Sequence, residues 1–359
     1  MRLRCLCPIV ALPRDLSAVG WDCKQLFIGS EGTLGVVTAV AVQGVPLLPA
    51  RNVALFAVDS FAAALRVHSE ARKACGETLC AVELLDSSAM ALTLGRPIGG
   101  SDTIQTAAAP AAVPGFLKPG SHLSPFYVLI ETRGSNTAHD SEKLGALLEG
   151  VSICGAAVDG AVAADERQAT AIWSLREGVT SALSRRGHGF KVRSPRALHA
   201  SRLRILATSR PTSRGSPLLR PPQYDLCFAP ARMLDIVVAA QERVAPWADD
   251  GVVALAYGHM ADGNVHLNVS SRWAKNASSG SDARGIAAVE RALEPWVFEA
   301  TINAGGSISA EHGLGQAKAE WLERARPASV VALHRDLKRL LDEHGILNPG
   351  KVDLGAATT

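Results

Sequence analysis

The chain has 359 residues, 47% of them hydrophobic and 20% charged, a balance typical of a globular protein with one large domain or two. Its formal net charge is +3, but residues 192–223 hold seven arginines and no acid, so the remaining chain carries −4. This mildly acidic remainder excludes a protein that binds nucleic acid over its whole surface. No apolar run reaches the roughly 18 residues of a membrane-spanning helix, and the seven irregularly spaced cysteines fit neither a zinc ribbon nor a disulfide framework.

The first twenty residues carry two arginines ahead of a short apolar run, as a targeting segment does. Pro8 and Pro13 interrupt that run, and Asp15 counts against a transit peptide. Residues 29–35, GSEGTLG, then place three glycines at short intervals, which allows a backbone to approach a ligand closely. An ordinary turn is the alternative interpretation.

Residues 53–159 show a strand–helix–strand pattern twice over. The pattern predicts strands over 53–58, 78–85, 126–132 and 153–159, and helices over 61–75 and 139–150. Two such repeats favour a ferredoxin-like α+β unit with a mixed or antiparallel sheet and its helices on one face. The stretch 97–124 between the repeats is rich in Gly, Pro, Ala and Ser, which is typical of a flexible surface loop.

A single helix is predicted over 164–187, with acids near its start and Arg185 and Arg186 near its end, as the helix dipole favours. Arg176 and Thr180 lie four residues apart and therefore share one face. The arginine-rich segment 192–223 follows, and its composition predicts a disordered insertion rather than a packed element. A nucleic-acid-binding arm is the alternative, although no aromatic residue interleaves its charges.

The sequence YGHMADGNVHLNV, residues 257–269, reads as two strands joined by a tight turn. If Asp262 and Gly263 form a two-residue turn, His259 pairs directly with His266, with β-carbons roughly 4.5–5.5 Å apart. Two imidazoles held this close suit one metal ion. A surface hairpin with two incidental histidines remains the alternative.

Residues 305–318, GGSISAEHGLGQAK, place Glu311 and His312 between glycine-rich turns. With His259 and His266, Glu311 would complete a two-histidine, one-carboxylate set, which leaves a coordination position open for water or substrate. The sequence contains no HExxH helix, so a zinc protease of that type is disfavoured. Further helices are predicted over 231–247, 281–303 and 327–344, the second despite Pro295.

Five motifs in one order resemble the FAD-linked oxidases of the vanillyl-alcohol oxidase type. They are LFIGSEGTLGVVTAV (26–40), SLREGVT (174–180), YGHMADGNVHLNV (257–269), SAEHGLGQAK (309–318) and HGILNPGKV (344–352). Within that family the chain is most similar to the branch that oxidises D-2-hydroxyglutarate.

The resemblance implies three domains: residues 1–45 as the C-terminal remnant of an FAD-binding domain, 46–325 as a substrate-binding cap, and 326–359 as a helical segment that packs back toward the FAD domain. Most of the FAD-binding domain would be missing, so that the chain by itself is expected to be inactive. The flavin would contact residues of the glycine-rich loop and one later asparagine: Gly29, Ser30, Glu31, Gly32, Thr33, Gly35 and Asn348.

The resemblance also implies roles around the substrate. Arg176, Thr180 and Lys191 would hold its carboxylates, and Asn268 would hydrogen-bond to it. His312 would bind the substrate and act as the general base. The metal ligands would be His259, His266 and Glu311, a set that suits zinc, although manganese or iron would also fit.

The implied activity is FAD-dependent oxidation of D-2-hydroxyglutarate to 2-oxoglutarate in the mitochondrion, with an acceptor such as an electron-transfer flavoprotein. Two alternatives stay open: a relative that oxidises D-lactate or glycolate, and a metal-binding fragment without catalysis. No nucleic acid and no membrane span are expected.

Overall fold

The structure, a computed structural model, describes residues 21–42, 44–98, 113–190, 224–273 and 280–353. These fall into two units: a larger one between Leu48 and Ala310, and a smaller one that combines the residues up to Leu47 with those from Glu311 onward. The larger unit ends at Ala310. The reason is a set of bonds after Ala310, where the amides of Leu314 and Gly315 donate to the carboxylate of Glu31.

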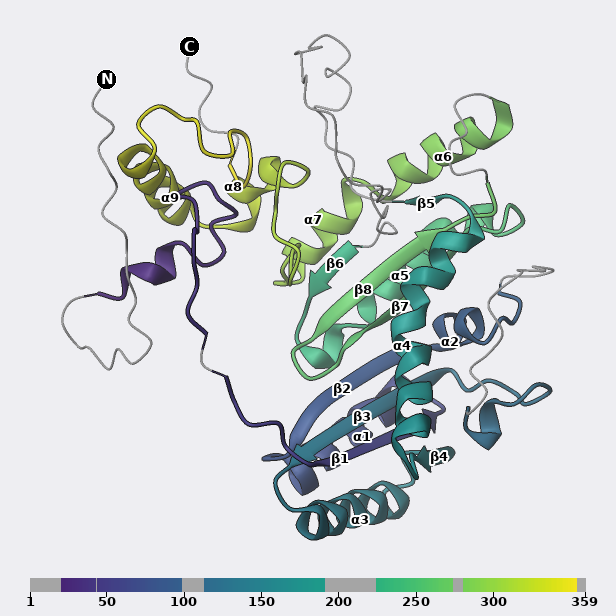
Figure 1. The fold of residues 1–359 in the computed structure, drawn as a ribbon. Coiled ribbons are helices and arrows are strands. Elements are labelled where there is room, and N and C mark those ends of the chain that lie inside the picture. Colours follow the sequence, from purple (N-terminus) through teal and green to yellow (C-terminus); the bar gives the residue numbers. More distant parts are fainter. Residues whose placement is uncertain (1–20, 43, 99–112, 191–223, 274–279, 354–359) are drawn as a thin grey trace, which may run out of the picture. The chain divides into compact units, whose positions relative to one another are not determined.

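The larger unit is built on one antiparallel sheet, which contains eight strands in the described residues (Figure 1). The strands are β1 (Ala50–Val58), β2 (Leu79–Asp86), β3 (Phe126–Gly134), β4 (Asp159–Val162), β5 (Gly189–Phe190), β6 (Tyr224–Cys227), β7 (Val253–His259) and β8 (Asn264–Ser270). Their order is β4-β1-β3-β2-β7-β8-β5, and β6 also pairs with β8. The sheet confirms the α+β class and the antiparallel arrangement.

Strands β1 to β4 and two helices form the ferredoxin-like half. Helices α1 (Phe61–Cys75) and α3 (Thr137–Ile153) pack against each other on one face of the sheet. The fourth strand begins at Asp159 and not at residue 153, because α3 continues to Ile153. Gly155, just beyond its end, has a φ of +57° that a side-chain-bearing residue rarely adopts, and it terminates the helix.

The opposite face is covered as well, by α2 (Ser87–Thr93) and α4 (Glu166–Arg186). The two helices predicted within residues 53–159 thus share one face, as expected, and α2 and α4 cover the other face of the sheet. The physical reason is that β1 is buried at six successive positions, from Val53 to Val58, so both of its faces exclude water.

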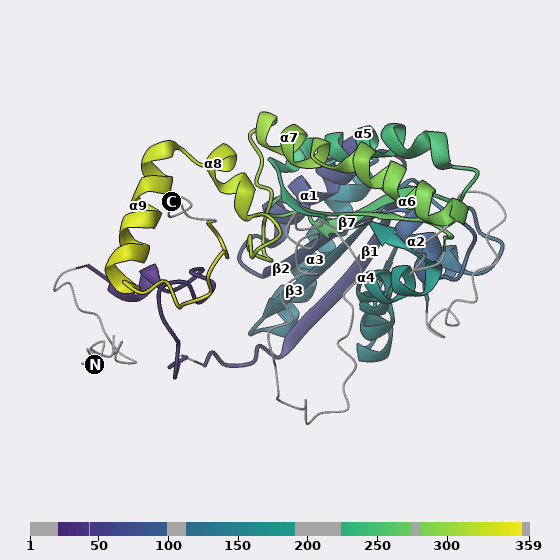
Figure 2. The ribbon, with the colours of Figure 1, turned by 90° about the horizontal axis from the view of Figure 1, so that it is seen from above.

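The second half of the larger unit carries α5 (Asp235–Val244), α6 (Gly280–Leu293) and α7 (Trp296–Asn303). Figure 2 shows these three helices on the side of the sheet away from α4. The single helix predicted over 281–303 is two helices, because Pro295 has no amide hydrogen and interrupts the pattern.

In the smaller unit, α8 (Leu322–Ala325) precedes α9 (Ala328–Leu341). The 3-10 helices of the described chain are η1 (Cys23–Leu26), η2 (Gly115–Leu117), η5 (Pro230–Arg232), η6 (Ala245–Trp247) and η7 (Ala319–Trp321). Over the part that the structure describes, no helix combines the length and the apolar character needed to cross a bilayer.

The predicted loops are only partly visible. Residues 99–112 and 191–223 lie outside the described residues, and with them half of the first predicted insertion and all of the second. The described ends of the first stretch are anchored and not free on the surface, because Ile98 and Leu117 are buried in the core against α2 and α4.

Candidate active site

The hairpin of β7 and β8 positions both histidines, but not in the register that the sequence suggested. Tyr257 pairs with His266, and His259 pairs with Asn264. The strands are joined by four residues, since the amide of Gly263 donates to the carbonyl of His259 at 3.1 Å and so closes a wider turn. The prediction that His259 and His266 stand directly opposite each other is therefore wrong.

The two histidines nevertheless share one face. The pairing has moved by two residues, and side chains alternate with a period of two, so an even shift keeps every side chain on its side of the sheet. The imidazole centroids of His259 and His266 lie 5.4 Å apart with their planes at 80°.

A buried carboxylate on the neighbouring strand holds His259. Glu83, in the middle of β2, is the register partner of His259, and its side chain is 4% exposed. Its Oε1 lies 2.7 Å from Nδ1 of His259, and its Oε2 accepts a 2.7 Å hydrogen bond from Nε of Arg176. Burial opposes ionisation of Glu83, but the hydrogen bond from His259 and the charge of Arg176 outweigh it and hold its pKa below the ordinary value.

Helix α4 supplies Arg176 and Thr180 above this strand pair. The helix starts where Asp165 caps it by accepting a hydrogen bond from the amide of Gln168. The guanidinium carbon of Arg176 lies 4.4 Å from the centroid of the Tyr257 ring. Thr180 Oγ1 lies 2.6 Å from the Tyr257 hydroxyl, so both predicted residues meet at the same tyrosine.

Strand β8 adds a row of buried polar side chains: Asn264, His266 and Asn268, all on the face of the histidines. Asn268 Nδ2 donates to the carbonyl of His266, while its Oδ1 has no hydrogen-bond partner among the described residues. Neither side-chain atom of Asn264 has such a partner there, although the residue is only 2% exposed. Because unsatisfied buried amides are costly, this face is suited to a polar ligand.

Strand β6 borders the same row. Asp225 pairs with His266, and its Oδ1 lies 3.9 Å from Nδ1 of that histidine. The amide of Ala310, the last residue of the larger unit, donates to the carbonyl of Asp225 at 3.4 Å.

Glu311 and His312 belong to the smaller unit, as the first two residues of its last segment. Lys191 lies outside the described residues. The larger unit thus brings together Arg176, Thr180, His259, His266 and Asn268, and the roles of all predicted residues stay predictions.

The predicted flavin contacts gather in the smaller unit. Ser30, Gly32, Gly35 and Asn348 line a cavity of about 450 Å³, together with the apolar side chains of Phe27, Val36, Val37, Ile346 and Leu347. A cavity with apolar walls and a few polar groups suits a planar aromatic ring with polar edges. Gly29 and Thr33 belong to the same loop, and Thr33 Oγ1 donates to the carbonyl of Ser30.

Glu31 has a structural task in this loop. Its carboxylate accepts hydrogen bonds of 2.8 Å from the amides of both Leu314 and Gly315. Its carbonyl accepts a hydrogen bond from Nδ2 of Asn348. These bonds join the loop to two later motifs, SAEHGLGQAK (309–318) and HGILNPGKV (344–352). Three stretches that are distant in the sequence are thus in contact within the smaller unit.

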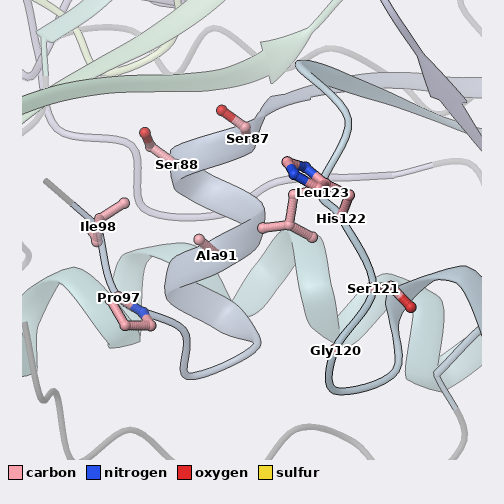
Figure 3. A pocket seen from close by; sticks show the side chains of 9 residues that line it. All are labelled: Ser87, Ser88, Ala91, Pro97, Ile98, Gly120, Ser121, His122 and Leu123. Atoms are coloured by element: carbon pink, nitrogen blue, oxygen red, sulfur yellow. The ribbon is translucent and has the colours of Figure 1, made fainter. Parts of the chain in front are cut away.

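A further cavity of about 450 Å³ opens beside α2 (Figure 3). It is lined by Ser87, Ser88, Ala91, Pro97, Ile98, Gly120, Ser121, His122 and Leu123. None of the predicted site residues lies in it, so it does not compete with the histidine face as the candidate site.

Three residues of the cluster were not assigned to the site from the sequence: Glu83, Tyr257 and Asn264. A signal exists for Glu83, because a single acid interrupts the apolar strand CAVELL (80–85), and a buried acid needs a partner. Tyr257 and Asn264 lie within the hairpin motif, at positions of the same alternation as the histidines.

The chain matches the family model "FAD linked oxidases, C-terminal domain" over residues 47–192 and 214–352. It is 38% identical to the mitochondrial D-2-hydroxyglutarate dehydrogenase of Bos taurus, over 93% of this chain and 49% of that protein. It is 33% identical to a putative mitochondrial D-lactate dehydrogenase of Schizosaccharomyces pombe, over 96% of this chain and 55% of that protein. The chain thus spans about half the length of the curated relatives that it matches.

Solved structures share the fold at low sequence identity. A p-cresol methylhydroxylase with bound substrate superposes with a TM-score of 0.55 and 11% identity, over 87% of this chain and 54% of that one. An alkyldihydroxyacetonephosphate synthase superposes with a TM-score of 0.54 and 15% identity, over 92% of this chain and 49% of that one.

Proposed function

The chain belongs to the FAD-linked oxidases, and we propose that it provides the substrate- and metal-binding part of an enzyme that oxidises D-2-hydroxyglutarate to 2-oxoglutarate. The observation that carries the proposal is the cluster on one buried corner of the sheet. There a guanidinium suited to a carboxylate and a histidine suited to a metal bond to the same carboxylate, that of Glu83.

Arg176 is the proposed carboxylate-binding residue. Its Nε is bonded to Glu83, and its plane lies over the Tyr257 ring, so the side chain is oriented before a substrate arrives. The two terminal nitrogens of a guanidinium can donate to both oxygens of one carboxylate. Thr180, on the same helix face, would add a hydroxyl, and Lys191 would add a second positive charge.

His259 and His266 are the proposed metal ligands. Because Glu83 accepts from Nδ1 of His259, the lone pair of the neutral ring lies on Nε2, the atom that a metal would bind. Glu311 is the proposed third ligand. Ala310 is bonded to the strand beside His266, and consecutive Cα atoms are about 3.8 Å apart, so Glu311 follows directly after that point.

Zinc suits this set of two imidazoles and one carboxylate, and manganese or iron would also fit. A bound divalent ion would lower the pKa of the substrate hydroxyl. His312 would accept the hydroxyl proton at an imidazole nitrogen. Asn268 would hold the substrate through its side-chain amide.

FAD, when bound, would accept the hydride from the substrate carbon. We propose that Ser30, Gly32, Gly35 and Asn348 contact it, since they line one cavity of the smaller unit. Gly29, Glu31 and Thr33 would support this loop through their backbone and hydrogen bonds. We also propose a mitochondrial location, as the names of the relatives indicate, and an acceptor such as an electron-transfer flavoprotein.

A relative that acts on D-lactate is the second candidate, favoured by the similarity to the putative D-lactate dehydrogenase. The two substrates differ by a second carboxylate, so the discriminating quantity is the ratio of their affinities. A dicarboxylate site should bind D-2-hydroxyglutarate at least tenfold more tightly than D-lactate, because one additional charge-assisted hydrogen bond contributes about 1.5–3 kcal/mol.

The test is calorimetric titration of the zinc-loaded chain with both acids. Arg176→Ala should abolish measurable binding of D-2-hydroxyglutarate and leave the zinc content unchanged, because Arg176 touches the acid and not the ion. Arg167→Ala, on the exposed start of α4, is the matched control and should bind as the wild type does. Equal affinity in Arg176→Ala and the wild type would contradict the proposal.

A further inference from the structure

Glu83 occupies a position where an acid is unexpected. It lies in the interior of β2, among Val82, Leu84 and Leu85, and is 3% exposed. Removing a carboxylate from water costs several kcal/mol unless charged or hydrogen-bonded partners replace the solvent. A strand buried on both faces would be more stable with an apolar residue here, so a role beyond stability is indicated.

The two oxygens of Glu83 serve two separate elements. Oε1 accepts from His259 on β7, and Oε2 accepts from Arg176 on α4, both at 2.7 Å. Either bond by itself would orient only the partner that makes it. Together they fix the spacing between a ring on the sheet and a guanidinium on a helix.

Resting on the proposed function, we propose that Glu83 is a positioning residue that couples the metal-binding His259 to the carboxylate-binding Arg176. For His259, the bond would keep the proton on Nδ1 and leave the lone pair of Nε2 for a metal ion. For Arg176, the bond on Nε leaves the two terminal nitrogens for a substrate carboxylate. A single carboxylate would thus fix the metal-binding ring relative to the carboxylate-binding guanidinium.

If Glu83 couples the two residues, its substitution should lower the affinity for both ligands. If Glu83 only stabilises the fold, its substitution should lower the stability alone. Glu83→Gln keeps the size of the side chain but removes the negative charge that both donors share, and it places an NH2 group, which cannot accept, against one of them. Both ligand affinities should therefore fall: zinc affinity 10–100-fold, as is usual when a histidine loses its outer carboxylate, and D-2-hydroxyglutarate affinity at least tenfold. Arg176→Ala, by contrast, should lower the affinity for the acid alone.

The matched control is Glu131→Gln. Glu131 lies on the same face of the sheet, in β3, is 4% exposed, and is bonded to Arg51, Arg133 and Trp173 of α4. It is therefore an equally buried carboxylate that joins the sheet to the same helix without contacting His259 or Arg176. Its substitution should destabilise the fold to a similar degree and leave both affinities within twofold of the wild type.

The experiment measures zinc affinity by competition with a chromophoric chelator, D-2-hydroxyglutarate affinity by calorimetry, and thermal unfolding by circular dichroism. Loss of both affinities in Glu83→Gln but not in Glu131→Gln supports the proposal. Wild-type zinc affinity in Glu83→Gln, or an equal loss in Glu131→Gln, overturns it while the proposed function stands. A wild-type chain that binds neither zinc nor the acid overturns both.

Discussion

At the scale of single residues, Asp86 shows how a buried carboxylate can serve the fold rather than the site. Its Oδ1 accepts from the amide of Ala89 at the start of α2, and its Oδ2 accepts from the amide of Ala256 in β7. Burial raises the pKa of Asp86 to about 6, because these amide bonds only partly replace water. Asp86 therefore joins β2, α2 and β7. It is the last residue of β2, the strand that also carries Glu83.

The raised pKa of Asp86 predicts a pH-dependent stability. The folded state binds this proton more tightly than the unfolded chain does, so the contribution is fully present below about pH 4 and is lost as the pH rises through 6. We expect the free energy of unfolding of the wild type, relative to Asp86→Asn, to fall by about 3 kcal/mol between pH 4 and 7. Urea denaturation at several pH values measures this difference.

The control for Asp86 is Asp250→Asn, on an exposed turn. It removes the same formal charge without changing a buried group, so its difference from the wild type should stay nearly constant over the same range. If the difference in the free energy of unfolding between the wild type and Asp86→Asn is also constant over this pH range, ionisation of Asp86 does not destabilise the folded protein.

At the scale of elements, β5 and β6 behave as two parts of one strand. Both are antiparallel to β8: Phe190 pairs with Val269, and Tyr224 pairs with Leu267. On β8 a single residue, Asn268, separates the two partners, whereas residues 191–223 separate the two strands along the chain. One residue would suffice to continue the strand, and the family match omits residues 193–213. We therefore expect residues 192–223 to be an insertion.

The register predicts the result of a deletion. Removing 192–223 leaves Lys191 to pair with Asn268, followed directly by Tyr224, and the strand becomes continuous. We expect cooperative thermal unfolding with a midpoint equal to or above that of the wild type, since closing a loop of this length costs about 3 kcal/mol. Circular dichroism on the two proteins measures the midpoints.

A deletion of 193–223 is the matched control, because it leaves one residue too many. A one-residue slip turns every following side chain to the other face, so this variant must form a bulge or lose the pairing of β6. Its midpoint should lie below that of the first deletion. If the first deletion abolishes cooperative unfolding, the segment is structural and the interpretation as an insertion is wrong.

At the scale of the whole molecule, the two units carry different proposed tasks. The larger unit holds the histidine face, and the smaller unit holds the cavity lined by Ser30, Gly32 and Asn348. The stretch after that cavity is strongly exposed although it is apolar, with Val36 76%, Val40 76% and Val42 82% exposed. An apolar surface of this kind marks a binding region more often than a solvated one.

These features predict weak retention of flavin. Within the residues that the structure describes, the predicted flavin contacts line one cavity with an exposed flank. We expect this to be too little to offset the ordering and desolvation costs of a large cofactor. We expect the purified chain to be colourless and to show no dye reduction with D-2-hydroxyglutarate. The visible absorption spectrum after purification decides this, and a flavin band at stoichiometric amounts would contradict the expectation.

The sequence alone determined those features that depend on neighbours along the chain. Acids near the start and arginines near the end predicted α4, and the spacing of four placed Arg176 and Thr180 on one face. Alternation in the hairpin likewise placed His259 and His266 on one face, and this survived the error in register because the shift was even.

Only the tertiary structure decided which distant residues meet. The partner of His259 is Glu83, 176 positions away, and the choice depends on how β2 and β7 align in the sheet. The turn of the hairpin also depends on a distant contact. A Cβ at Gly263 would lie 1.8 Å from the carbonyl oxygen of Phe228, the residue that follows β6. The backbone is too close there for any residue other than glycine. Periodicity is a local property of the chain, whereas strand alignment and close backbone approach are set by long-range packing, and no local pattern encodes them.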